Sequence, residues 1–188
     1  GVQWMRAGKG IVHSEMPEQE SGLLKGFQLW VNLPSKDKMC EPAYQEFVAN
    51  DLALQMREDG GQVRVVAGHT NEGTAGPVTR EDIKPIFMDV NLPAGGTFTQ
   101  AIKAGDSAFI YAISGDVLVG DEQVLCSRQL GIFGEGTSVT ITACETKAQF
   151  LLVAATPINE PVARGGPFVM NTKEQVMQAF NDYRNNRF

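Results

Sequence analysis

The sequence predicts a mostly β protein, an antiparallel sandwich or barrel, that ends in a short helix. Apolar and polar residues alternate in several short runs, which is the pattern of half-buried strands. Turn-forming residues separate these runs, and the chain contains 20 glycines and 9 prolines among its 188 residues. A capping motif followed by a helical apolar stripe near the C-terminus predicts the helix. Short strands at this spacing indicate an antiparallel fold.

The alternation is clearest in residues 27–32 and 86–92, where every second side chain is apolar and would point to one face of a sheet. Further strands are expected at residues 62–67, 97–103, 108–114, 117–119, 138–142 and 149–155. Ser114-Gly115-Asp116 separates two of these runs and predicts a tight hairpin between them.

Two stretches depart from this alternation. Residues 41–56, which are charged at their ends, are expected to be helical or irregular and to link two β modules. A turn is expected at Gly165-Gly166-Pro167, and a helix over about 172–184, because Thr172 and Gln175 have the spacing of a capping box. The apolar stripe of that helix consists of Val176, Phe180 and Tyr183, with Met177 beside it.

Charge and composition limit the classes of function. The formal net charge of −6 argues against tight, non-specific binding of nucleic acid, which needs lysine and arginine to displace counterions. No apolar run approaches the roughly 20 residues that span a bilayer, and the longest cluster, residues 150–155, is typical of a buried strand. Three widely spaced cysteines without a CxxC pattern are interpreted as idle thiols of a reducing compartment.

A histidine and a glutamate two residues apart form the one motif that suggests chemistry. On an extended strand, His13 and Glu15 would project side by side into a barrel interior. Imidazole and carboxylate groups are suitable ligands for Fe(II), Mn(II) or Zn(II). A firm site needs three or four ligands, so a surface or structural pair explains the same two residues. The other histidine, His69, lies in a segment rich in glycine and threonine and is expected to be an exposed loop residue.

Several segments, in the same order, resemble the pirin family of the cupin superfamily. The likeness covers essentially the whole chain and is carried by residues 3–17, 27–34, 38–39, 41–46, 109–117, 134–136 and 166–172. It implies an all-β bicupin, with two tandem cupin domains of the double-stranded β-helix or jelly-roll type. The chain opens at Gly1 within an apolar segment and without a methionine, so the first domain is expected to be truncated.

The resemblance also implies how the chain divides. Residues 1–47 would be the C-terminal part of the first, metal-binding cupin, and residues 48–61 a linker. Residues 62–163 would form a second, metal-free cupin, and residues 164–188 the C-terminal turn and helix. The absence of any histidine after His69 agrees with a metal-free second domain.

Pirins hold one non-haem iron with three histidines and a glutamate, and the resemblance places His13 and Glu15 as the later two of these ligands. The earlier two histidines belong to a His-x-His segment that is expected upstream of this chain. Fe(II) is therefore the expected cofactor, with other divalent transition metals as alternatives.

The resemblance leaves three functions open. Some bacterial pirins are quercetin (flavonol) 2,3-dioxygenases, which implies an oxidoreductase with Glu15 as both ligand and catalytic base. Other pirins are redox-sensitive co-regulators that bind a transcription factor or a metabolic enzyme without turnover. The third reading is an inert bicupin remnant.

The expected partner is a small aromatic flavonol or a protein, with no direct nucleic acid or membrane binding. A monomer in the cytoplasm, or in the nucleus of a eukaryote, is expected.

Overall fold

The computed structural model describes residues 1–14, 16, 21–79, 83–121 and 123–188. It divides into two compact units, each built from two separate stretches of the chain. The first unit consists of Gly1–Trp4 and Glu46–Pro157, and the second of Met5–Gln45 and Ile158–Phe188. In the described part of the chain, no helix is long and apolar enough to cross a membrane.

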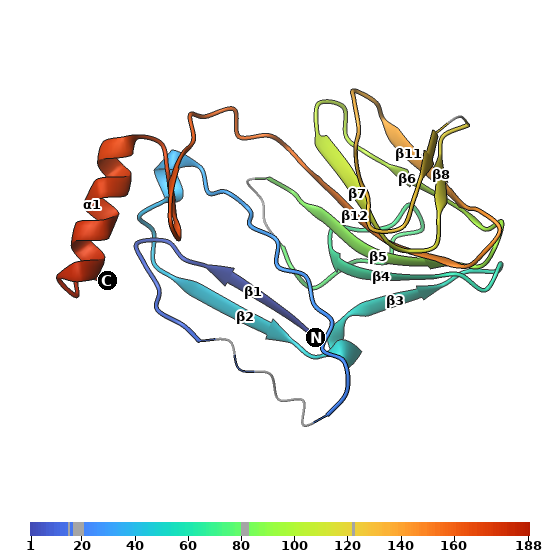
Figure 1. Ribbon diagram of the computed structural model, residues 1–188, viewed down its shortest axis with the longest axis horizontal. Coiled ribbons are helices and arrows are strands. Elements are labelled where there is room, and N and C mark those ends of the chain that lie inside the picture. Colours follow the sequence, from blue (N-terminus) through green and yellow to red (C-terminus); the bar gives the residue numbers. More distant parts are fainter. Residues whose placement is uncertain (15, 17–20, 80–82, 122) are drawn as a thin grey trace. The chain divides into compact units, whose positions relative to one another are not determined.

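The first unit is a sandwich of two antiparallel sheets (Figure 1). The larger sheet has six strands in the order β10-β7-β12-β5-β4-β3, and the smaller has four in the order β6-β11-β8-β9. Their bounds are β3 (Ala53–Met56), β4 (Gln62–Ala67), β5 (Ile86–Leu92), β6 (Thr97–Ala101), β7 (Ser107–Ser114), β8 (Val117–Val119), β9 (Gln123–Leu125), β10 (Leu130–Ile132), β11 (Ser138–Ala143) and β12 (Ala148–Ala155). A short 3-10 helix, η2 (Ala49–Asp51), precedes β3.

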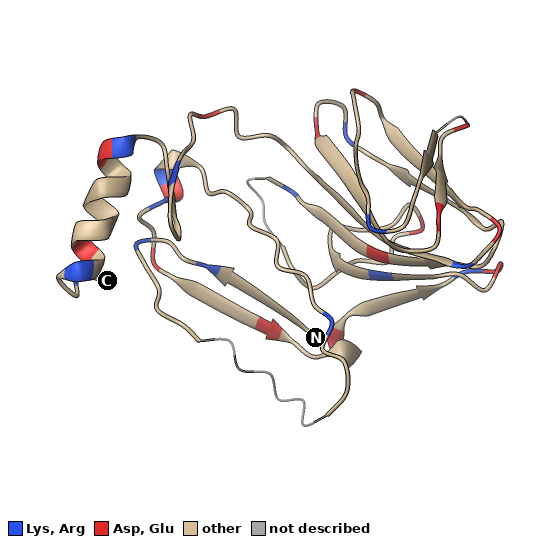
Figure 2. Ribbon diagram, in the orientation of Figure 1, with Lys and Arg blue, Asp and Glu red and all other residues tan. Residues whose placement is uncertain are grey.

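The core of this unit lies between the two sheets because successive side chains of a strand point to opposite faces. In β12, buried and half-buried residues alternate without a break, and Phe150 and Leu152 are fully buried. The ring of Phe150 packs against that of Phe98 from the other sheet, with centroids 6.3 Å apart. Charged residues lie mainly in turns and near strand ends (Figure 2). The interior of the sandwich is therefore apolar, and its stability comes mainly from burial.

The second unit contains a hairpin of β13 (Ala163–Gly165) and β14 (Phe168–Met170), the 3-10 helix η1 (Ser35–Asp37) and the helix α1 (Lys173–Arg184). The chain passes between the units within β1 (Val2–Arg6) and β2 (Ala43–Phe47), which pair as a two-stranded sheet. A Cβ added to Gly165 would lie 2.6 Å from Val176 Cγ1, so glycine allows α1 to pack closely on the hairpin. Thr172 caps α1, and its hydroxyl accepts a hydrogen bond from the Gln175 amide.

Most of the expected strands are present. The strands expected at 62–67, 86–92 and 117–119 have those bounds, and β6, β7, β11 and β12 differ from expectation by one or two residues at their ends. The C-terminal helix and its capping box are also confirmed. Both patterns are local, because strand alternation and a capping box depend on residues a few positions apart.

The expected strand at residues 27–32 is wrong, since no strand is assigned there and most of its apolar side chains are exposed. Residues 41–56 do not merely link modules, because they contain the strands β2 and β3 beside the short 3-10 helix η2. The segment 48–61, expected to be a linker, contributes β3 to the edge of the six-stranded sheet. The hairpin at Ser114-Gly115-Asp116 is also wrong, because β7 pairs with β10 and β12 whereas β8 pairs with β9 and β11. That turn carries the chain from one sheet to the other.

Two neighbouring leucines of β12 provide a matched test of the sandwich. Leu152 is fully buried between the sheets, whereas Leu151 is half-buried on the opposite face. We expect Leu152→Ala to lower the free energy of unfolding by about 2–5 kcal/mol, since it leaves a cavity in the core. Leu151→Ala removes the same atoms and should lower the free energy of unfolding clearly less. Urea unfolding measures both, and an equal loss would contradict the assignment of faces.

Candidate functional site

A tight turn at Gly8 and Lys9 lies shortly before the His13 motif. Gly8 has φ of +52°, and a Cβ there would lie 2.1 Å from the carbonyl oxygen of Cys40, so only glycine fits. The Lys9 amide donates to that same oxygen at 2.8 Å. The Lys9 ammonium also pairs with the Glu41 carboxylate at 2.6 Å, but both side chains are exposed, so this ion pair adds little stability. The backbone contacts fix the turn.

The C-terminal residue packs on the chain just ahead of the motif. Gly10 has φ of +142°, and a Cβ there would lie 2.6 Å from the Phe188 ring. Phe188 in turn contacts Phe168, with ring centroids 5.8 Å apart and nearly perpendicular, and Tyr183 at the same centroid distance. Aromatic rings pack well in such tilted arrangements. Gly10 lies three residues before His13, so this aromatic cluster restrains the start of the motif.

His13 itself is exposed and lies outside any assigned strand. Glu15, its expected partner, lies outside the described residues, so their common orientation stays a prediction. Among the residues that the structure describes, no three histidine, cysteine, aspartate or glutamate side chains lie close enough to hold a metal ion. The described residues therefore do not form a metal site by themselves. His69 is exposed, as expected, and only its backbone carbonyl has a described role, accepting a hydrogen bond from Gln100.

Apolar side chains near the motif are exposed rather than buried. Phe27 and Trp30 are 54% and 55% exposed, so the segment expected to form a strand at residues 27–32 does not bury them. The Arg164 guanidinium lies 5.7 Å from the centroid of the Trp30 ring, a cation–π contact. Trp4, by contrast, is half-buried and packs on the cluster formed by Val66, Ala67 and Val78.

A polar network joins the two stretches of the second unit. The Glu160 carboxylate accepts hydrogen bonds from the Ser35 amide at 2.7 Å, from the Ser35 hydroxyl at 3.1 Å and from the Asn171 side chain at 3.0 Å. The Lys38 ammonium donates to Asn32 Oδ1 at 2.7 Å and to the Val169 carbonyl at 3.0 Å. These bonds hold residues 32–38 against residues 160–171.

The same network shifts two pKa values. The Ser35 amide, assisted by the Asn171 and Ser35 side chains and by the charge of Lys38, lowers the pKa of the Glu160 carboxyl. Burial lowers the pKa of the Lys38 ammonium, and the charge of Glu160 opposes that shift. Lys38 is 6% exposed, yet its hydrogen bonds satisfy the buried charge. Neither residue stands out in the sequence, because the bonds that join the two stretches, from Ser35 to Glu160 and from Lys38 to Val169, each span more than a hundred positions.

The chain matches two family models, described as Pirin over residues 1–31 and as the Pirin C-terminal cupin domain over residues 87–188. It is 47% identical to a pirin-like protein of Caulobacter vibrioides, over the whole of this chain and 67% of the relative. The chain belongs to the pirin family. Another family member, from Pseudomonas aeruginosa, carries the provisional name quercetin 2,3-dioxygenase and is 39% identical over 98% of this chain and 66% of its own length.

A solved structure supports the cupin fold that the family model indicates. The crystal structure of quercetin 2,3-dioxygenase from Acinetobacter baumannii matches with a TM-score of 0.78 and 34% identity, over 85% of this chain and 55% of that one. The all-β cupin architecture with a short C-terminal helix is thus as expected. This chain spans about two thirds of the length of its curated pirin relatives.

The contact between Gly10 and Phe188 can be tested by a double-mutant cycle. Gly10→Ala should displace the aromatic ring and strain the backbone, at a cost of about 1–3 kcal/mol of unfolding free energy. Phe188→Ala should also destabilise, and the double variant should cost little more than Gly10→Ala alone, since the ring contact can be lost only once. Gly26→Ala is the control, because a Cβ there meets no atom within 4 Å. Fully additive effects would refute the contact.

The Glu160 network predicts a specific pH dependence. Because the folded-state pKa of Glu160 is lowered, its stabilisation is present above the ordinary glutamate pKa and is lost as the pH falls through the folded value. Glu160→Gln should therefore lower Tm near neutral pH, and the difference from the parent should shrink as the pH falls below about 4. Thermal unfolding from pH 7 to 3 measures this. Glu145→Gln, at an exposed position of the other unit, is the matched control.

Proposed function

We propose that this chain forms part of a metal-dependent oxidoreductase of the quercetin (flavonol) 2,3-dioxygenase type. The observation that carries the proposal is that two similar proteins bear this name, one provisionally and related by sequence, the other related by both sequence and fold. A flavonol is a flat aromatic molecule with several hydroxyl groups, and its oxidation by dioxygen requires a redox-active centre.

The metal of such an enzyme needs more ligands than the described residues bring together. We propose that it is a non-haem iron held by His13 and Glu15, together with the two upstream histidines that the resemblance implies. Histidine and carboxylate donors suit Fe(II), and four such ligands leave coordination positions open to other molecules. Such an iron would supply the redox chemistry for dioxygen. Glu15 would in addition accept a proton from a flavonol hydroxyl as a general base.

Exposed apolar residues around the motif support a larger first domain. The large apolar side chains between residues 12 and 31 are all at least about one-third exposed: Val12, Met16, Leu23, Leu24, Phe27, Leu29, Trp30 and Val31. Apolar surface concentrated in this way marks an interaction site rather than ordinary solvent-facing surface. We propose that residues 1–47 belong to a metal-binding cupin whose other strands cover this segment. The greater length of the relatives agrees with this proposal.

Replacement of His13, but not of His69, should impair iron binding if the metal site is where we propose. In the protein extended by the upstream segment that the resemblance implies, His13→Ala should weaken iron binding at least about 10–100-fold, the range found even for residues that only support a ligand. Flavonol-dependent uptake of dioxygen should fall with it. His69→Ala is the matched control, because His69 is exposed in the other unit and should leave both measurements unchanged.

The role of Glu15 gives this experiment a second arm. Glu15→Gln retains the size of the side chain and one oxygen, so iron binding should weaken less than in His13→Ala while turnover is lost. If the unsubstituted protein bound iron tightly but showed no flavonol-dependent oxygen uptake, the enzymatic proposal would be overturned and a redox-sensitive binding protein favoured. Unchanged iron binding in His13→Ala would show that the ligands lie elsewhere.

A further inference from the structure

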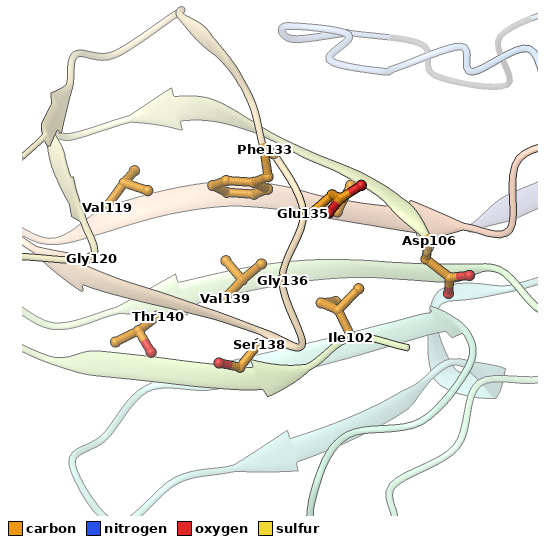
Figure 3. Close-up of a pocket in the computed structure, with 12 residues that line it drawn as sticks. Ile102, Asp106, Val119, Gly120, Phe133, Glu135, Gly136, Ser138, Val139 and Thr140 are labelled. Atoms are coloured by element: carbon orange, nitrogen blue, oxygen red, sulfur yellow. The ribbon is translucent and has the colours of Figure 1, made fainter. Parts of the chain in front are cut away.

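A pocket opens at the end of the first unit's sandwich, away from the His13 motif in sequence (Figure 3). Its volume is about 250 Å³, just below the range of typical ligand pockets. The segment 133–136, which follows β10, forms one side, and the beginning of β11 forms another. Figure 3 shows the side chains of Phe133, Val139 and Ile102 around a common space. The pocket thus lies entirely within one unit.

The floor of the pocket is part of the hydrophobic core. Ile102, Ala108 and Val139 belong to the core cluster, and each is 6% exposed, whereas the other members of that cluster are 3% exposed or less. Val119 and Phe133, which also line the pocket, pack against the same cluster. These three residues are therefore slightly less covered than the rest of the core, and a ligand there would contact the small apolar area that they, Val119 and Phe133 leave exposed.

The charges at this pocket are both negative. Asp106 and Glu135 line it, and none of the described residues that line it is basic. Both lie toward the same end of the pocket in Figure 3. Asp106 is half-buried and held in place, because its Oδ1 accepts a hydrogen bond of 2.7 Å from the Thr156 hydroxyl. Among the described residues, no side chain donates a hydrogen bond to its second carboxylate oxygen. The pocket therefore combines an apolar floor with a negative rim.

Neither packing nor backbone conformation in the described chain requires glycine at the two positions beside Glu135. A Cβ added to Gly134 would meet no atom within 4 Å, and one on Gly136 would meet only the Ser138 carbonyl oxygen at 3.9 Å. Neither is among the described glycines with positive φ. Backbone conformation and packing thus permit larger residues at both positions. A remaining reason for glycine is that another molecule approaches the backbone closely.

We propose that this pocket binds a small organic cation, a protonated amine on a compact apolar body. The apolar part would cover Ile102, Val139 and Phe133, and the ammonium group would lie between the two carboxylates. In the partly desolvated mouth of a pocket, opposite charges attract more strongly than in open water. An anionic ligand would be repelled. The described residues offer too few ligands here for a metal ion. The site is independent of the proposed dioxygenase activity.

The test uses the 188-residue chain and three probes of similar shape. 2-Phenylethylamine is the cation, 2-phenylethanol the neutral analogue and 3-phenylpropanoate the anion. Titration followed by amide NMR should give saturable shifts for the amine, concentrated in residues 102–108 and 133–140. The neutral probe should bind at least about threefold more weakly, as expected for the loss of a partly exposed ion pair. The anion should produce no saturable shifts there, and added salt should lower the affinity for the amine.

Isosteric and steric variants then locate the site. Asp106→Asn retains an oxygen for the Thr156 hydroxyl, and Glu135→Gln retains the size of the side chain, so both should fold. The double variant should bind the amine roughly tenfold more weakly and no more tightly than the alcohol. Gly136→Val should block binding by its volume, whereas Gly26→Val, equally unhindered in the other unit, should not. Equal binding of all three probes, shifts outside these residues, or normal binding by the double variant would each overturn the proposal.

Discussion

The packing of apolar side chains between two sheets is the interaction on which the first unit depends. Phe150 and Phe98 meet across the sandwich, and the alternation of β12 places every second residue in that layer. The pocket beside Glu135 lies where members of this layer are slightly less covered than the rest. The second unit has no comparable layer, since only Pro34, Lys38 and Val176 are buried among its described residues. It is held instead by hydrogen bonds and by aromatic contacts around α1.

Much of the sandwich could be predicted because its determinants are local. The strands β4 and β5 follow directly from alternation, and the start of α1 from a capping box. Pairing could not be predicted in the same way. Residues 27–32 alternate as well as any strand, yet no strand forms there, because alternation shows which face is apolar and not what will cover it. The short strand β3 has a weak pattern and forms at a sheet edge through its pairing with β4.

The candidate sites differ in how far the sequence could reveal them. His13 and Glu15 attracted notice because two ligand types lie two residues apart, but their significance came from a family resemblance and not from chemistry alone. Glu135 lies in one of the segments that carry the family resemblance, residues 134–136, and nothing in the sequence joins it to Asp106 or to the apolar floor. The Glu160 network was not expected, because its partners lie 125 residues apart along the chain and become neighbours only through the fold.

The division of the second unit between both ends of the chain has a consequence for synthesis. Ser35 leaves the ribosome 125 residues before Glu160, its hydrogen-bonding partner. At elongation rates of about 5–20 residues per second, that interval is on the order of ten seconds. The intervening residues can complete the sandwich in this time, whereas residues 32–38 must wait for their hydrogen-bonding partners in residues 160–171. A nascent chain therefore presents this segment to chaperones and to other unfinished chains after its sandwich has closed.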